Sequence, residues 1–593
     1  MKRFFCVLAA LLLILTSLMP TLAAVPQHEG IARVTGAVQD CVGTDTAGAA
    51  VILFENGSRI LYEGYGYADI SARTLVTAQT QFELGEISSL FVALGVYALA
   101  DEGKVELDRD IAYYLPADFM KKLDLSHTVT LNDLLAGRAG FADRYFDQRY
   151  TDPSLVFDTL EQALLAEVPA QSEPTGNTYA YSRFGLTLAA FVLERASGTD
   201  YATYVSEKIL APLGMTNTVL APHVQTAEKM AGGHTVKGEG SFAVVKDAGR
   251  SYSALWPADG AVSNAADLSL LLQYLLGSET GEKILTPALE NGVFQTGIAG
   301  LGVSGSARAM RASVLHFSAS LAIDPENGSA ALVLCNTDDT ALLDAPYTYC
   351  GFLSGAVAGS DNAVLPDPTE FEGEYILRTK TNGVLLSRGV KNIRISVDDT
   401  GMLLFGDKEL VQIAPGIFAD PADQTHAVLQ FQTDIEGNVT GLITASGESY
   451  RVAEWQESNV IVNLLFIALS LGAVYFLLGG ILALADALLS RARGERRPRA
   501  WRFTLPWVFA SVSGLVVLIQ ILVCDRFGAA TIASFRTACA TISLIFVIGA
   551  VCGFVYALFT AFTVRRMTAR VARSAIIYVL FLAVCGYWGV ILI

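Results

Sequence analysis

Residues 179–218 read "YAYSRFGLTLAAFVLERASGTDYATYVSEKILAPLGMTNT". Apolar side chains recur at helical spacing over 182–197 and again over 200–210, which predicts two consecutive helices. The phrase "ILAPLGMTNT" at 209–218 is not demanded by helix propensity. The order of these elements therefore says more about the fold than secondary structure alone.

Strand patterns lie on both sides of this stretch. Residues 48–69 alternate apolar and polar side chains around a turn at Asn56–Gly57, which indicates a β-hairpin. Residues 317–336 read as strand, turn and strand, and helical periods over 86–102 and 266–277 lie between the two strand regions. Because strands enclose helices, we predict an α+β domain whose sheet is closed by its termini.

The C-terminal part of the chain has a different composition. Residues 361–368 have the composition of a linker, and 369–455 show short alternating stretches between turn signals, which predict a small all-β domain. Four apolar runs near the ~20 residues that span a bilayer come next, at about 460–484, 504–524, 540–562 and 575–593. We therefore predict a four-helix transmembrane region.

The N-terminus predicts export. Residues 1–24, "MKRFFCVLAALLLILTSLMPTLAA", have a charged head, an apolar stretch and small residues at the end, which is typical of a signal peptide. The alternative is an uncleaved anchor, which would also export the domain behind it.

The distribution of charged residues along the chain predicts the same orientation across the membrane. Residues 456–593 carry twelve arginines against four acidic residues, a net charge of +8 within a chain of −17 overall, which leaves −25 for the rest. The loops at 490–502 and 563–570 are arginine-rich, and such loops favour the cytoplasmic side. We expect a multi-pass protein of the cell membrane whose large acidic domain is extracytoplasmic. The −25 body argues against nucleic acid as a partner.

The cysteines predict no metal centre. Only Cys41, Cys335 and Cys350 lie in the exported body, so at most one disulfide can form there, with the pairing left open. No cysteine or histidine spacing matches a metal site, and we expect neither metal nor cofactor.

Several phrases resemble one enzyme family in a consistent order. They are "ILYEGYGYADISARTLVTAQTQFELGEIS" (60–88), "ALADEGKVELDRDIAYYLP" (98–116), "VTLNDLLAGRAGF" (129–141), the 179–218 stretch, "PADGAVSNAADLSLLLQYL" (257–275) and "LAIDPENGSAALVLCN" (321–336). Together they resemble the serine β-lactamase and penicillin-binding-protein-like hydrolases of the class C type. The resemblance implies a β-lactamase/transpeptidase-like fold, with an antiparallel sheet and a helical subdomain.

The domain boundaries agree with this resemblance. We expect a signal peptide at 1–24, a β-lactamase-related domain at 25–360, a small β-barrel-like domain at 366–456, and four transmembrane helices at 457–593. The barrel expectation also rests on the resemblance, because many of these proteins carry such an extension.

The catalytic clusters implied by the resemblance are degenerate. The Ser-x-x-Lys motif is replaced by Glu86 and Ser89, so a nucleophilic hydroxyl and its activating cation are both missing. In the Tyr-x-Asn motif Tyr181 is present, but Arg183 stands in place of the asparagine. A third triplet, expected to begin near Met310, is absent.

The substitutions predict a changed set of charges. We expect Glu86 and Arg183 to pair across the former site, with the Tyr181 hydroxyl in the network. We expect Arg308 and Arg311 on the same rim, which would suit an anionic small ligand. The alternatives are that Glu86 only caps its helix, that Arg183 faces solvent and that Tyr181 is a packing residue.

Three functional hypotheses remain. The first is a membrane-anchored pseudoenzyme that binds a cell-wall peptide, another small ligand or a partner. The second is an active serine hydrolase, an esterase, D-Ala peptidase or β-lactamase-like enzyme. The third places the function in the transmembrane bundle, which would bind a protein partner while the exported domain is structural. Charges within the predicted spans are scarce, which disfavours a transporter.

Overall fold

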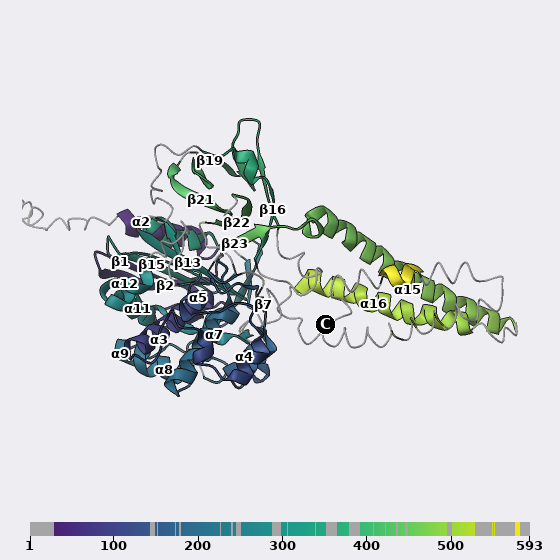
Figure 1. Cartoon of the computed structure of the whole chain (residues 1–593), viewed down its shortest axis with the longest axis horizontal. Coiled ribbons are helices and arrows are strands. Elements are labelled where there is room, and N and C mark those ends of the chain that lie inside the picture. The colour runs from purple at the N-terminus through teal and green to yellow at the C-terminus, as the bar shows by residue number, and fades with distance from the viewer. Residues whose placement is uncertain are drawn as a thin grey trace, which may run out of the picture.

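The structure, a computed structural model, describes residues 29–527 with internal gaps and only a few positions beyond (Figure 1). The larger gaps are 143–148, 245–250, 287–297, 352–364, 379–391 and 495–500. The predicted signal peptide lies outside the described residues, as do most of the third and fourth predicted spans.

A seven-stranded antiparallel sheet forms the centre of the largest part of the chain. Its strands in spatial order are β12 (Gly302–Ser304), β13 (Ala307–Val314), β14 (Phe317–Asp324), β15 (Ser329–Cys335), β1 (Gly48–Glu55), β2 (Ser58–Asp69) and β3 (Thr74–Leu75). The hairpin turn sits at Asn56–Gly57, and both residues have positive φ, as a tight turn between twisted strands requires. β1 pairs with β15 from Ala49 opposite Cys335 onward, so the two ends of the sequence region meet in the sheet, as predicted.

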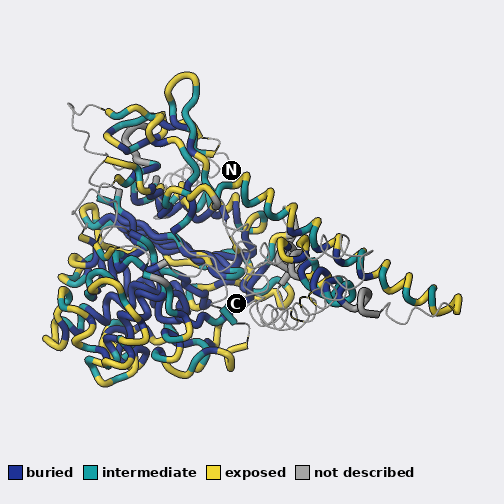
Figure 2. Tube along the Cα trace, turned by 45° about the vertical axis from the view of Figure 1, so that its right-hand side comes forward, coloured by how far each residue is buried: buried dark blue, intermediate teal, exposed yellow. Residues whose placement is uncertain are grey.

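Helices cover both faces of this sheet. Because side chains alternate along a strand, Ala50 and Ile52 of β1 face one core and Ala49 and Val51 face the other. The first core is closed by α3 (Ser89–Asp101), α7 (Arg183–Ser197) and α11 (Ala265–Gly277), and the second by α2 (Glu29–Cys41) and α13 (Ala345–Tyr349). Figure 2 shows the sheet and the helical layer as the most buried parts of the molecule.

Short elements complete the helical layer. The helices are α4 (Ala117–Leu123), α5 (Leu131–Leu135), α6 (Leu160–Ala166), α8 (Tyr201–Val205), α9 (Ala211–Leu213), α10 (Trp256–Asp259) and α12 (Glu279–Leu285), and the strands are β4 (Gln81–Glu83), β5 (Phe141–Ala142), β6 (Arg149–Tyr150), β7 (Ala170–Gln171), β8 (His234–Gly238), β9 (Ser241–Val244), β10 (Tyr252–Ser253) and β11 (Val262–Asn264).

A closed eight-stranded antiparallel barrel comes next along the chain. Its strands are β16 (Gly373–Leu377), β17 (Ile393–Val397), β18 (Leu403–Phe405), β19 (Lys408–Ala414), β20 (Ile417–Asp420), β21 (Asp423–Thr433), β22 (Val439–Thr444) and β23 (Ser449–Val452), and β23 pairs with β16 to close it. Aromatic side chains of Phe371, Tyr375, Phe418 and Phe431 pack together in its core. The predicted small all-β domain is therefore a barrel.

Two long helices lie beside each other beyond the barrel. α15 (Asn459–Ala492) and α16 (Trp501–Phe527) extend away from the rest of the chain (Figure 1). Only α15, among the described residues, is long and apolar enough to cross a membrane. The prediction of a four-helix transmembrane region is therefore not supported as made: within α16 the apolar helix Pro506–Ile519 is shorter than a span, and the later spans are outside the described residues.

Candidate functional site

Glu86 lies where the helical layer approaches the edge of the sheet. It belongs to the 3-10 turn η1 (Gly85–Ser88), which leads into α3. Gly85 has φ +54°, and a Cβ there would lie 3.1 Å from the Cβ of Ala312 on β13, so this turn runs close against the strand. β12 pairs with β13 only as far as Ala309. Beyond Ala309, β13 still pairs with β14 on one edge, and its other edge lies against η1.

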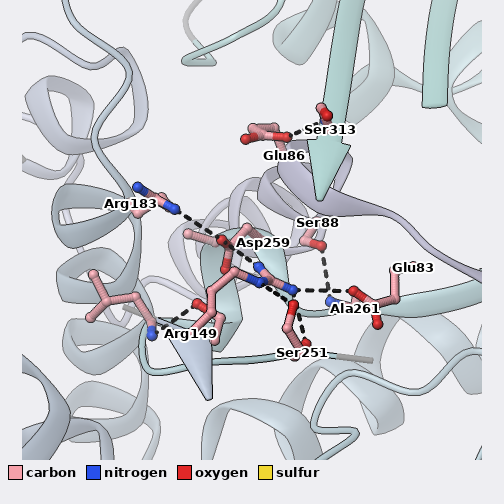
Figure 3. A network of polar contacts seen from close by, with 12 residues as sticks. Glu83, Glu86, Ser88, Arg149, Arg183, Ser251, Asp259, Ala261 and Ser313 are labelled. Atoms are coloured by element: carbon pink, nitrogen blue, oxygen red, sulfur yellow. Dashed lines mark hydrogen bonds and ion pairs between the residues drawn. The ribbon is translucent and has the colours of Figure 1, made fainter. Parts of the chain in front are cut away.

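The Glu86 carboxylate binds this edge of β13. Its Oε2 accepts a hydrogen bond from the backbone N–H of Ser313 at 3.0 Å, as Figure 3 shows. Burial raises the pKa of Glu86, and the negative charge of Asp259 raises it further. Hydrogen bonds from the backbone N–H groups of Glu86 itself and of Ser313, and the charge of Arg183, act in the opposite direction. Two backbone donors therefore converge on one carboxylate.

Asp259 is the centre of a buried charge network. It ends α10 and its side chain is 1% exposed. Its Oδ2 lies 2.9 Å from Nη1 of Arg149 and 3.5 Å from Nη1 of Arg183 (Figure 3). Its Oδ1 is buried without a hydrogen-bond partner in the described part of the chain. One carboxylate thus bridges two guanidinium groups.

Arg149 has a second set of partners. It lies on β6, which pairs with β10, and its Nη2 is 3.1 Å from Oε2 of Glu83. It also donates to the Oγ of Ser251 at 2.7 Å and to the carbonyl of Ser251 at 3.0 Å. Sequence reasoning missed Arg149 and Glu83. Asp259 stood in the quoted phrase 257–275, but no pattern pointed to its role.

Glu86 and Arg183 each bind a residue other than the predicted one. Arg183 reaches Asp259, and Glu86 reaches Ser313, as the dashed lines in Figure 3 mark. The two side chains still influence each other, because the charge of Arg183 lowers the pKa of Glu86. Arg183 starts α7 and is partly exposed, with Asp259 as a competing and more buried anion.

Tyr181 is held as a neutral donor. Its hydroxyl donates to the carbonyl of Ala258 at 3.1 Å. Burial raises its pKa well above the usual range, and the charges of Glu86 and Asp259 raise it further. The phenol therefore stays protonated, which does not suit a proton-accepting role.

The two serines beside Glu86 contact no base among the residues that the structure describes. The Ser88 Oγ accepts a hydrogen bond from the backbone N–H of Ala261 at 3.0 Å. Ser89 is fully buried at the start of α3, and its Oγ has no hydrogen-bond partner there. Neither environment activates a hydroxyl.

The remaining predicted residues do not form a common rim. Met310 is fully buried on β13, beside Gly300. Arg311 points to the opposite face of the sheet, where its Nη2 lies 2.8 Å from Asp344. Arg308 is buried and its Nε donates to the carbonyl of Leu285 at 2.6 Å, at the end of α12. The shared cationic rim expected from Arg308 and Arg311 is therefore not formed.

The described residues contain no cluster of three or more histidine, cysteine or acidic side chains that could hold a metal ion. Cys41, Cys335 and Cys350 are buried free thiols.

Comparison with known proteins assigns the family. The family model for Beta-lactamase matches residues 34–348, more than half of the chain. The chain belongs to the beta-lactamase family. This assignment covers the serine β-lactamase and penicillin-binding-protein-like fold around the central sheet, and it leaves the barrel and the long helices outside the match.

Individual relatives of the beta-lactamase family are distant. Protein flp of Staphylococcus aureus (strain MRSA252) is 24% identical over 192 residues, which is 32% of this chain and 38% of that protein. Penicillin-binding protein 4* of Bacillus subtilis (strain 168) is 24% identical over 168 residues, 28% of this chain and 37% of that protein. The chain thus spans well under half the length of these relatives.

Solved structures of related fold are also similar to the chain. SurE is 19% identical, covering 71% of this chain and 98% of that chain, with a TM-score of 0.49. A class C beta-lactamase is 18% identical, covering 56% of this chain and 99% of that chain, with a TM-score of 0.45.

Three of the site positions that the family resemblance predicted, Glu86, Tyr181 and Arg183, lie in the same region of the structure. Arg183 contacts Asp259, and Tyr181 donates to the carbonyl of Ala258, the residue before Asp259. The charges of Arg183 and Asp259 both act on the pKa of Glu86. Among the described residues, Arg149 and Arg183 pair with Asp259, Arg149 also pairs with Glu83, and Glu86 lies within electrostatic reach, which gives these five side chains a net charge of −1 when Glu86 is ionised. The anionic ligand that the sequence suggested stays a prediction.

Proposed function

We propose that this chain is a membrane-anchored, extracytoplasmic member of the beta-lactamase family that binds a ligand or partner without catalysing acyl transfer. The observation that carries the proposal is the hydrogen bond from the backbone N–H of Ser313 to the carboxylate of Glu86. This contact bears on the two chemical requirements of acyl transfer, a stabilised oxyanion and an activated nucleophile.

Acyl transfer needs a stabilised oxyanion. Two preorganised backbone N–H groups aimed at one point are the usual device, and losing one such donor costs about 10²–10³ in rate. Here the N–H groups of Glu86 and Ser313 both bind the Glu86 carboxylate. The Glu86 carboxyl group thus occupies the place where charge would have to develop.

Acyl transfer also needs an activated nucleophile. Glu86 stands at the nucleophile position of the resemblance, and Ser89 stands at the position of the lysine. Ser89 is fully buried, Ser88 accepts from a backbone N–H, and Tyr181 is a protonated donor. A serine without a neighbouring base is a poor nucleophile.

Membrane anchoring is supported by α15. Its 34 residues correspond to ~50 Å of helix, against ~30 Å of hydrocarbon in a bilayer. It keeps large apolar side chains exposed along its length, among them Leu464, Leu471, Ile481 and Leu482. Together with the predicted signal peptide and the arginine-rich loops, this supports a multi-pass anchor with the sheet and the barrel outside.

We propose a cell-wall peptide or another anionic small ligand as the ligand class. A protein partner that binds through the membrane helices remains the second proposed partner.

The test is covalent labelling of the full chain in detergent. A fluorescent penicillin and a fluorophosphonate are incubated with the protein, and the mass of the intact chain is measured. No adduct is expected. A stable adduct on any serine would favour the active serine hydrolase and overturn the proposal. The variant Glu86→Ser/Ser89→Lys/Arg183→Asn is the matched comparison: labelling of this variant alone would place the loss of chemistry at these three positions.

A further inference from the structure

The joint between the barrel and α15 is short and ordered. β23 ends at Val452 and α15 starts at Asn459, so only residues 453–458 lie between them. Half of these form the 3-10 turn η9 (Trp455–Glu457). Little of the connection is therefore left to act as a hinge.

Side chains from the barrel hold this joint at several points. Arg451 of β23 makes a two-pronged pair with Glu457, with Nη1 and Nη2 at 2.7 and 2.6 Å from the two carboxylate oxygens. Asn392, just before β17, donates from Nδ2 to the carbonyl of Glu457 at 2.8 Å. Paired contacts of this kind fix orientation as well as distance.

The first turn of α15 is tied to the barrel as well. The Oε2 of Glu374, on β16, accepts from the backbone N–H of Asn459 at 2.9 Å, and its backbone carbonyl accepts from the N–H of Ala453 at 2.8 Å. The N–H groups of a first helical turn lack partners within the helix, so a carboxylate there satisfies one of them and matches the helix dipole. Strands at both sides of the barrel seam therefore set the direction of α15.

An exposed aromatic residue lies at this joint. Trp455 is 78% exposed, and the neighbouring apolar side chains of Val452 and Val460 are exposed too. At ~1.5 Å per helical residue, Trp455 is within one or two turns of the start of the apolar helix. Indole rings with an apolar body and a polar N–H gather at the boundary between lipid headgroups and acyl chains.

We propose that Trp455 and its neighbours Val452 and Val460 form a membrane-contact surface that sits in the headgroup layer of a phospholipid bilayer. The contacts of Glu374, Asn392 and Arg451 hold the barrel at a fixed height and tilt above that layer. This inference rests on the proposed membrane anchoring. The occupant is the bilayer, because the surface is continuous with the apolar helix that would enter it.

The test uses the full chain in nanodiscs of phosphatidylcholine and phosphatidylglycerol. Trp455→Cys is compared with Tyr113→Cys, a residue 65% exposed on the helical layer. Labelling by a charged, membrane-impermeant maleimide is followed at each site by peptide mass spectrometry and normalised to the rate in SDS. The thiolate is the form of cysteine that reacts with a maleimide, and transfer of a thiol out of water raises its pKa. The thiol introduced at position 455 is therefore expected to label about tenfold more slowly than the thiol at position 113.

Equal normalised rates at the two sites, with the chain inserted in the nanodisc, would overturn this inference and leave the anchor intact. A chain that does not insert at all would contradict the proposed anchor, and the inference with it. A second comparison adds Arg451→Gln to Trp455→Cys. Losing the two-pronged pair should raise the labelling rate at position 455 toward the rate at position 113, and an unchanged rate would contradict the proposed role of the barrel contacts.

Discussion

Replacing Asp259 with alanine should destabilise the protein severely. The carboxylate is 1% exposed and bridges Arg149 and Arg183, so its loss leaves two guanidinium groups beside each other in a buried place. Breaking a buried ion pair by removing one partner costs about 3–5 kcal/mol. In the Asp259→Ala variant, Arg149 would still contact Glu83 at 3.1 Å and the two Ser251 acceptors, and Arg183 is partly exposed to water. We therefore expect a loss at the lower end of this range, about 3 kcal/mol of unfolding free energy.

The matched control is Asp344→Ala. Asp344 also accepts a guanidinium, that of Arg311 at 2.8 Å, but its side chain is 67% exposed. Exposed pairs contribute about 0–1 kcal/mol, so this variant should unfold close to the wild-type temperature.

The assay is thermal unfolding of the full chain in detergent, followed by near-ultraviolet circular dichroism. At about 2–4 °C per kcal/mol for a domain of this class, Asp259→Ala should lower the midpoint by about 6–12 °C. If Asp259→Ala unfolds no earlier than Asp344→Ala, the assignment of Asp259 as the centre of the network is refuted.

Two further predictions concern Glu86 and the helix pair. Burial and the charge of Asp259 raise the pKa of Glu86 in the folded state. Because the pKa of a glutamate in the unfolded chain is about 4.3, the folded state loses stability as the pH rises from that value through the higher pKa of the folded state. Glu86→Gln should therefore unfold at a higher temperature than wild type near neutral pH and at the same temperature below about pH 4, and a constant difference in melting scans across pH would contradict this. A Cβ at Gly480 would overlap the side chain of Ser511, so Gly480→Leu should separate α15 from α16 and lower the helix unfolding temperature in far-ultraviolet dichroism. The control Leu471→Phe changes an exposed side chain of α15 and should not have this effect, and equal effects of the two substitutions would contradict the packing.

The regular elements were predictable because local chemistry determines them. The helix expected at 182–197 is α7, which starts at Arg183 because the Ser182 Oγ accepts from the N–H of Gly185 at 2.8 Å and ends at Gly198 in the left-handed conformation. The hairpin at Asn56–Gly57 is explained by the φ values such a turn requires.

The site was only partly predictable, because its partners come from distant segments. Glu86 and Arg183 could be singled out as departures from a motif, and Tyr181 as the motif residue that is retained. Arg149 on a two-residue strand and Asp259 at the end of a four-residue helix carry no spacing signal, and only the fold brings them together. Arg308 and Arg311 were expected on one rim, but they lie three residues apart on β13, so their side chains point to opposite faces of the sheet.

The proposal that this chain does not catalyse acyl transfer is tested most directly by turnover. Hydrolysis of a chromogenic cephalosporin and of a p-nitrophenyl ester is measured with the purified full chain and with its Ser88→Ala/Ser89→Ala variant. We predict that both proteins give the rate of buffer alone. A rate that rises in proportion to wild-type protein and disappears in the double variant would contradict the account.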